Sequence, residues 1–270
     1  MWNKVQETVK FLQEKGFSTP DYGIVLGSGL GNLVDVMQVE VKIPYEEIPN
    51  FKVSTVAGHS GNLYFGTISG KKVVIQQGRF HFYEGWSMQD VTFPIRVMKF
   101  LGTDNLIVSN ASGGVNADFK VGDIMIISDQ IGFLMENPLL GINEERFGNR
   151  FVDMHDTYDK PMIVLMEQVA KNQNINLKKG VYLGVSGPTF ETPAEYNMVR
   201  NLGADTVGMS TVPEVIVAKH MNMKCFGLSV ITDLGVEGEV VSVSHEEVQI
   251  AAKAAEKVMS KLMVEFLSIL

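Results

Sequence analysis

The side chains with the clearest chemistry lie at residues 76–85, which read Gln-Gln-Gly-Arg-Phe-His-Phe-Tyr-Glu-Gly. They follow a β-branched run, residues 72–75, that predicts a strand. In an extended segment Arg79 and His81 point to one side, and the phenylalanines between and after them point to the other. Arginine offers a fork of donors that suits phosphate or carboxylate, and histidine adds a titratable donor. The stretch therefore indicates an anion site at a strand's end; the alternative is an arginine and a histidine on a solvated loop.

A glycine loop near the start of the chain is a second candidate anion site. Residues 22–26 predict a short apolar strand, residues 27–31 read Gly-Ser-Gly-Leu-Gly, and a helical pattern through residues 33–37 follows. Strand, glycine loop and helix can cradle a phosphate with backbone N–H groups. A dinucleotide fingerprint would need glycine where the chain has Asn32, and the Gly-Lys-Ser/Thr of a Walker loop is absent. Ser28 is thus either a phosphate donor or a plain turn serine.

Two more glycine-rich segments accompany predicted strands. Residues 110–114, Asn-Ala-Ser-Gly-Gly, predict a loop at the carboxyl end of a strand over 105–109, where open α/β sheets place their ligands. Residues 58–61, Gly-His-Ser-Gly, carry His59. For His59 we favour a polar surface loop over a ligand contact, because loops are polar by default.

An aromatic side chain and a carboxylate stand together at Phe190 and Glu191, just before a predicted helix start. The start is a capping box over residues 192–195, with proline at the first helical position. A ring beside a carboxylate suits a flat heterocycle with N–H donors, because the ring can stack and the carboxylate can accept. The alternative is a helix-capping loop with a packed phenylalanine.

Two later helix starts place further candidates. Residues 211–214, Thr-Val-Pro-Glu, predict a capping box that leaves Ser210 just before a helix N-terminus, whose dipole favours an anion by ~0.3–1 kcal/mol. Residues 244–247, Ser-His-Glu-Glu, predict the cap of the last helix, with His245 in its first turn. Taken alone, His245 reads as a solvated surface histidine.

The elements that must position these residues alternate between strand and helix. The further helices are expected at residues 3–15, 87–100 and 159–171, the further strands at 63–68, 71–76, 124–128, 181–186, 206–209 and 225–231, and a long surface loop at 137–156. No change of composition divides the chain. We therefore predict one α/β domain over residues 1–270, with a mixed central β-sheet flanked by helices.

Composition excludes several classes of function. The chain has 270 residues, a net charge of −8 and no basic stripe, so we expect no nucleic acid and no membrane partner. The single cysteine, Cys225, fits a reducing cytoplasm, and the charged start is unlike a signal peptide. No metal site is expected, because the five histidines lack zinc-ligand spacing; they are His59, His81, His155, His220 and His245.

Five ordered motifs, taken together, resemble the trimeric purine nucleoside phosphorylases and their methylthioadenosine phosphorylase relatives, which act in purine salvage. The motifs are Leu-Gly-Ser-Gly-Leu-Gly (26–31), Gln-Gly-Arg-Phe-His-Phe-Tyr-Glu-Gly (77–85), Asn-Ala-Ser-Gly-Gly-Val-Asn (110–116), Gly-Pro-Thr-Phe-Glu-Thr-Pro-Ala-Glu (187–195) and Gly-Met-Ser-Thr-Val-Pro-Glu (208–214). The likeness covers nearly the whole chain. It implies a nucleoside phosphorylase-like fold, a homotrimer, purine nucleoside and inorganic phosphate as substrates, and no cofactor.

The resemblance also implies a role for each candidate residue. Phosphate would be held by Ser28, Arg79, His81, the backbone N–H of Ala111, and Ser210; ribose would contact Tyr83, Met209 and His245; the purine would face Phe190, Glu191 and Asp233. Phe151 would reach into the sugar site of the neighbouring subunit. The catalytic residues implied are His81, which orients phosphate, and Asp233, which hydrogen-bonds or protonates the leaving purine.

Asp233 departs from the family pattern. Members that prefer 6-oxopurines generally carry asparagine there, whose amide can donate to O6 and accept from N7–H. An ionised carboxylate would repel O6 but accept from a 6-amino group. We therefore hypothesise activity on adenosine, alone or beside inosine and guanosine, although Glu191 matches the N1–H of a 6-oxopurine.

Two alternatives stay open. A 5′-methylthioadenosine phosphorylase also uses aspartate near the base, but His245 suits a 5′-hydroxyl better than an apolar methylthio group, and Ser210 is threonine in those enzymes. A non-catalytic purine-binding protein could use the same scaffold, since fold alone does not decide function. The intact set of polar candidates argues against that reading.

Overall fold

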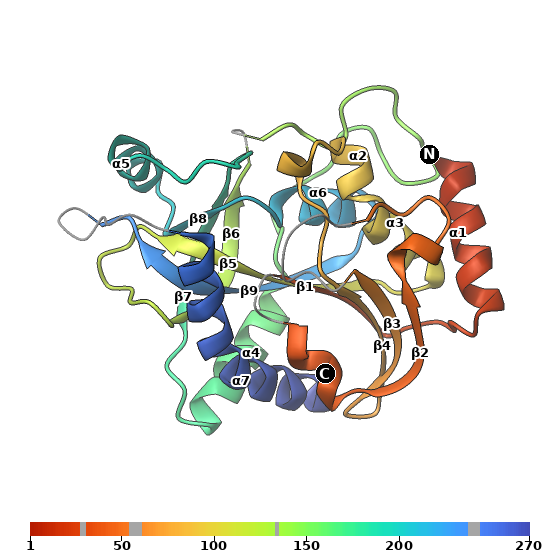
Figure 1. Ribbon diagram of the computed structural model, residues 1–270, viewed down its shortest axis with the longest axis horizontal. Helices are drawn as coiled ribbons and strands as arrows, with labels where there is room; N and C mark the ends of the chain where they lie inside the picture. Colours follow the sequence, from red (N-terminus) through yellow and green to blue (C-terminus); the bar gives the residue numbers. More distant parts are fainter. Residues whose placement is uncertain (28–30, 54–60, 133–134, 237–243) are drawn as a thin grey trace.

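The computed structural model describes residues 1–27, 31–53, 61–132, 135–236 and 244–270. Within these residues the strands form one mixed sheet, and helices lie on both of its faces (Figure 1). The α/β fold class predicted from alternating strand and helix patterns is confirmed.

One half of the sheet is open and is centred on β1 (Tyr22–Leu26). Strand β1 lies between β4 (Lys71–Gln77) and β5 (Asn105–Gly114) and runs parallel to both. Strand β3 (Asn62–Ile68) forms the predicted hairpin with β4 through a two-residue turn with positive φ at both positions. Strand β2 (Gln38–Pro44) pairs with β3 and forms the outer edge.

The other half of the sheet closes on itself. Strand β5 pairs in parallel with β9 (Lys224–Leu234) and, near its end, antiparallel with β8 (Thr206–Gly208). Strand β7 (Lys178–Gly184) joins β8, and β6 (Ile124–Ile131) joins β7 back to β9. The five strands therefore form a barrel-like ring, which the prediction of a mixed sheet did not anticipate.

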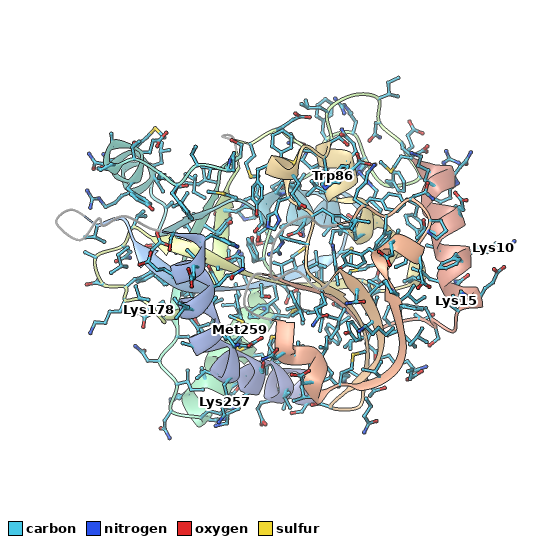
Figure 2. The ribbon with its side chains drawn as sticks, viewed as in Figure 1. Lys10, Lys15, Trp86, Lys178, Lys257 and Met259 are labelled. Carbon is cyan, nitrogen blue, oxygen red and sulfur yellow. The ribbon has the colours of Figure 1, made fainter. Side chains whose placement is uncertain are left out.

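Helices cover the sheet from two sides (Figure 1). Above it in that view lie α2 (Met88–Val91), α3 (Phe93–Leu101) and α6 (Val212–His220), with α1 (Trp2–Glu14) outside α3; below it lie α4 (Lys160–Asn172) and α7 (His245–Ile269). Helix α7 packs on β9 and α4. Its two faces differ, since Met259 is buried whereas Lys257 is exposed (Figure 2). No helix in the described ranges is long and apolar enough to span a bilayer.

Three predictions about which element a segment forms were wrong. Residues 31–36 form a 3-10 helix, Gly31–Val36, rather than the start of an α-helix. The helix expected over 87–100 breaks at Thr92, because Pro94 lacks the N–H that a continuous helix needs and instead starts α3. Residues 110–114 are strand rather than loop, because β8 and β9 satisfy their backbone groups.

Candidate active site

Most of the residues predicted to bind ligand meet in one cavity of about 310 Å³. Its lining includes Arg79, His81, Tyr83, Ala111, Phe190, Glu191, Met209, Ser210, Asp233 and His245. Strands β1, β4, β5 and β9 run parallel, so their carboxyl ends meet at one edge of the sheet, where this cavity lies.

Three predicted positions are not part of this group. Ser28 and His59 lie outside the described residues. Phe151 is 90% exposed and lies beside a different cavity, of about 490 Å³, in the long segment 137–156. A single chain therefore does not bring Phe151 to the other candidates.

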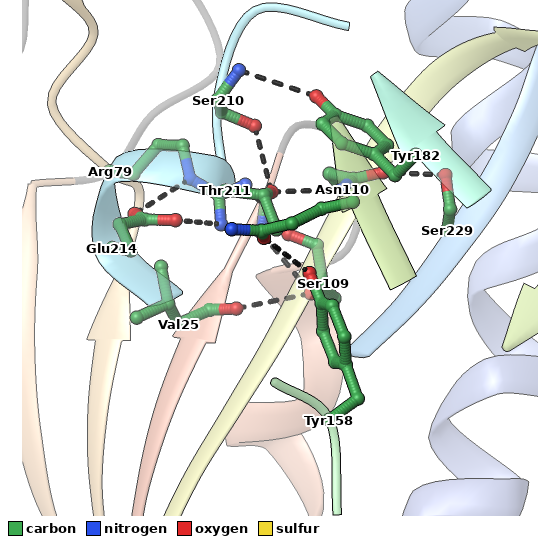
Figure 3. Close-up of polar contacts among 12 residues, drawn as sticks. Val25, Arg79, Ser109, Asn110, Tyr158, Tyr182, Ser210, Thr211, Glu214 and Ser229 are labelled. Atoms are coloured by element: carbon green, nitrogen blue, oxygen red, sulfur yellow. Dashed lines mark hydrogen bonds and ion pairs between the residues drawn. The ribbon is translucent and has the colours of Figure 1, made fainter. Parts of the chain in front are cut away.

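Arg79 is buried at the end of β4, with 2% of its surface exposed, so the solvated-loop alternative is wrong. Its Nε and Nη2 each donate to an oxygen of Glu214 at 3.0 Å, and Nη1 donates to the carbonyl of Ser109 at 2.6 Å (Figure 3). The Nε–Nη2 edge of the guanidinium is thus bound to Glu214. An anion in the cavity can meet Arg79 only along the other edge of the guanidinium.

The capping box predicted over residues 211–214 is wrong, although α6 does begin there. Thr211 has φ +69° and ψ −54°, and the N–H of Val212 donates to the carbonyl of Ser210 at 2.7 Å, which is a γ-turn. The Thr211 hydroxyl accepts from the Asn110 amide at 2.8 Å instead of capping the helix. Glu214 is likewise engaged elsewhere, since its carboxylate pairs with Arg79.

Ser210 is held from two sides, by Thr211 of this turn and by Tyr182 of β7. Its hydroxyl lies 3.1 Å from that of Thr211, and its backbone N–H donates to the Tyr182 hydroxyl at 3.3 Å. The hydrogen-bond network continues inward, because the side-chain oxygen Oδ1 of Asn110 accepts from the Ser229 hydroxyl at 2.5 Å (Figure 3). The Ser210 hydroxyl is therefore presented to the cavity by a buried network rather than by a mobile turn.

His81 lies beside the same end of the cavity and is 6% exposed. Its ring stacks on that of Tyr83 at 4.7 Å, and its backbone N–H donates to Glu84 at 2.8 Å. Phe80 is buried against Tyr45, which anchors the segment. Burial lowers the pKa of His81, and a hydrogen bond with Glu84 only partly opposes this. A neutral imidazole has one N–H, so in one tautomer His81 can donate either to Glu84 or to an anion, but not to both.

A second end of the cavity is lined by carboxylates. Asp233 reaches it from β9 and contacts Gly113, where an added Cβ would come within 2.8 Å of Asp233 Oδ2. Gly113 is three residues along β5 from Asn110, which corresponds to about 10 Å in a strand. Phe190 and Glu191 line this end from the segment before α5 (Pro193–Asn201). Donors and acceptors thus occupy separate ends of one cavity.

The predicted cap of α7 is confirmed. The Ser244 hydroxyl accepts from the N–H of Glu247 at 3.3 Å, and His245 lines the cavity from the first helical turn. The His245 ring lies 3.0 Å from the amide nitrogen of Gln249. His245 is therefore a cavity residue, which its sequence context alone did not predict.

Sequence reasoning missed the residues that support this site. They are Asn110 as a side chain, Tyr182, Tyr196, Thr211 and Glu214. One signal was available for Glu214: a carboxylate in the first turn of a helix proposed to face an anion calls for a cationic partner. Among the described residues, no group of three His, Cys, Asp or Glu side chains is arranged to hold a metal ion.

Comparison with known families gives a consistent result. The model of the phosphorylase superfamily matches residues 21–268. Purine nucleoside phosphorylase 1 of Bacillus subtilis (strain 168) is 51% identical over 248 residues, which are 92% of each chain. The purine nucleoside phosphorylase of Bos taurus is 47% identical over 96% of this chain and 92% of its own.

Solved structures agree with these relatives. Schistosoma mansoni purine nucleoside phosphorylase in complex with adenosine superposes with a TM-score of 0.94 at 42% identity, covering 99% of this chain and 97% of that one. A structure of Schistosoma mansoni purine nucleoside phosphorylase in complex with inosine also gives a TM-score of 0.94, at 40% identity, covering 99% of this chain and 96% of that one.

Proposed function

The chain belongs to the phosphorylase superfamily, among the purine nucleoside phosphorylases, and on that premise we propose that it cleaves purine nucleosides with inorganic phosphate. The products are the free base and ribose 1-phosphate or deoxyribose 1-phosphate, which makes the chain a pentosyltransferase. The observation that carries the proposal is a single cavity with donors at one end and carboxylates at the other.

Phosphate binds at the donor end in this proposal. Arg79 contributes positive charge, and His81, the Ser210 hydroxyl and the backbone N–H of Ala111 complete the set. Ser28 joins them by resemblance. Arg79 and Ser210 are held by buried contacts before substrate arrives, so little reorganisation of these two is needed when phosphate binds.

Phosphate bound at the donor end is placed to attack the sugar. A phosphate oxygen attacks the anomeric carbon, the bond from that carbon to the purine nitrogen breaks through a cation-like sugar, and the electron pair leaves with the base. The phosphate charge stabilises the sugar cation, so proximity and electrostatics supply most of the acceleration. Tyr83, Met209 and His245 line the middle of this path and contact the sugar.

The base leaves at the carboxylate end. Phe190 offers a ring for stacking, Glu191 accepts from or donates to the six-membered ring, and Asp233 hydrogen-bonds or protonates the imidazole side of the purine. Such general acid assistance is typically worth ~10²–10⁴-fold. Burial raises the pKa of Asp233, which favours a protonated population able to donate.

We further propose that residues 1–270 act as one domain in a cytoplasmic homotrimer without a cofactor. Phe151, Leu140 and Ile142 are exposed apolar side chains of one long segment, which is typical of an interface between subunits. Phe151 would then complete the sugar site of its neighbour. The single buried thiol of Cys225 fits a reducing compartment.

The proposal is tested by incubating the protein with inosine, guanosine and adenosine separately, each with phosphate and with chloride at matched ionic strength, and measuring the free base. Phosphate-dependent release is the expected result. Release at equal rates without phosphate would indicate a hydrolase and contradict the proposal. Release from 5′-methylthioadenosine alone would support the methylthio enzyme, and binding without release would support a purine-binding protein.

A further inference from the structure

Tyr196 is buried at the carboxylate end of the cavity, where no motif predicted a role for it. Its hydroxyl donates to Asp233 Oδ2 at 3.2 Å, and it also lies within hydrogen-bonding reach of the Glu191 carboxyl group. The ring is held in place by Gly235, where an added Cβ would come within 2.2 Å of it. One hydroxyl therefore faces two carboxyl groups.

A phenol has one proton to donate, so it cannot serve both carboxylates at once. Asp233 has a second donor, because the Thr232 hydroxyl donates to Oδ1 at 2.9 Å. Burial raises the pKa of both acids, the Asp233 charge raises that of Glu191 further, and Glu195 adds to it weakly. Burial also keeps Tyr196 protonated by raising its pKa. Two carboxyl groups that share a site in this way resist being ionised at the same time.

We propose that Glu191 and Asp233 share one proton beside the Tyr196 hydroxyl, and that the position of this proton lets the site accept both 6-oxopurines and 6-aminopurines. The inference rests on the proposed function, because it assumes that a purine occupies the carboxylate end. Tyr196 acts in it as a positioning residue, since it acts on the base only through the two acids.

The hydrogen-bond patterns of the two base classes are opposite. A 6-oxopurine donates from N1–H and accepts at O6, so it matches a charged Glu191 and a protonated Asp233. A 6-aminopurine accepts at N1 and donates from its amino group, so it matches a protonated Glu191 and a charged Asp233. Each arrangement holds one proton in total. With both acids ionised, each base class would meet one acceptor facing another acceptor.

The test uses two substitutions that replace the shared proton by a permanent donor. We would measure kcat/KM for inosine and adenosine across the neutral and alkaline range in the full-length protein. For the wild type we expect cleavage of both nucleosides, with kcat/KM for both declining in parallel as the pH rises and the proton is lost. Asp233→Asn should keep inosine and lose adenosine by about tenfold to hundredfold, and Glu191→Gln should do the reverse. In both variants the alkaline decline should disappear for the retained nucleoside.

Tyr196→Phe distinguishes the proton from simple packing. The ring still fills the space beside Gly235, but the hydroxyl that favours the charged acids is gone, so the alkaline decline should move to higher pH for both nucleosides. An equal loss of kcat/KM at every pH would show a packing role only and would overturn the inference. Selection of the same nucleoside by Asp233→Asn and Glu191→Gln would overturn it as well.

Failure of the proposed function can be told apart from failure of this inference. If no variant cleaves any nucleoside, calorimetric binding of hypoxanthine and adenine, each in two buffers of different ionisation heat, still measures the protons taken up or released. We choose a pH at which Glu191 and Asp233 have lost their shared proton in the protein without base. Binding of either base should restore one proton to the two acids, so both bases should show proton uptake at this pH. No uptake with either base would contradict the shared proton.

Discussion

Arg79 and Glu214 form a bidentate ion pair in which each side chain is 2% exposed, with both N–O distances at 3.0 Å (Figure 3). The pair joins the end of β4 to the first turn of α6. The same two places carry the donors proposed for phosphate, His81 and Ser210. The ion pair therefore sets the distance between the two halves of the anion site.

Glu214→Gln should destabilise the protein strongly. The substitution keeps the shape of the side chain but leaves the Arg79 charge buried without its partner, which typically costs about 3–5 kcal/mol. Urea denaturation measures the change, with Glu167→Gln as the control, because Glu167 forms a surface ion pair with Lys179. Equal effects of the two substitutions would show that the buried pair has no special weight.

The Thr211 hydroxyl should matter more than the shape of its side chain. Thr211→Val keeps the branched shape in the γ-turn but leaves the Asn110 amide without this acceptor, at a cost of about 1–3 kcal/mol. Because Ser210 then loses one of its two supports, KM for phosphate should rise more than KM for nucleoside. Thr211→Ser, which keeps the hydroxyl, is the control. A valine variant with unchanged phosphate KM would remove Thr211 from the supporting network.

Local signals were sufficient to predict much of this fold from sequence. Strand β1, the β3–β4 hairpin and the capping boxes at Thr192 and Ser244 depend on neighbours within a few residues, and each is confirmed. Features set by distant partners could not be predicted. The extension of β5 through Gly114 depends on β9, more than a hundred residues later, and so does the closing of the barrel.

The candidate site shows the same division. Motifs indicated which side chains carry chemistry, and the family resemblance indicated that they share one site. Neither could identify the residues that hold these side chains in position. Glu214 fits a capping box when only residues 211–214 are considered, and its bond to Arg79 crosses 135 positions. Tyr196 has no local signal, because its role arises only where α5 and the end of β9 meet.

Acid should weaken the fold partly through His81. An unfolded chain protonates its histidines near pH ~6.5, whereas burial lowers the pKa of His81. Below that pH the unfolded state binds more protons, so the free energy of unfolding falls as the pH falls. His81→Gln should reduce this slope between about pH 7 and pH 5.

Urea denaturation at a series of pH values measures this slope. Tyr83→Phe is the control, because Tyr83 stacks on His81 but burial raises its pKa to about 12, far above the range tested. Parallel curves for the wild type and His81→Gln would show that His81 does not contribute to acid sensitivity.

The exposed ring of Phe151 should be needed for activity but not for the fold of one chain. Because it is 90% exposed and lies away from its own chain's cavity, Phe151→Ala should change the free energy of unfolding little and lower kcat/KM. His245→Ala should also lower kcat/KM, but from within the chain's own cavity. If Phe151 completes the cavity of the neighbouring subunit, each cavity takes its His245 from one chain and its Phe151 from another.

Mixing the two variants separates these cases. After joint unfolding and refolding, some assemblies place a Phe151→Ala chain, whose own His245 is intact, beside a His245→Ala chain that supplies a native Phe151. Such a cavity is complete, so activity should rise above that of either variant alone. The control pair, His245→Ala with Glu191→Ala, affects two residues of the same cavity and should regain nothing. Recovery in neither mixture would show that Phe151 acts within its own chain or not at all.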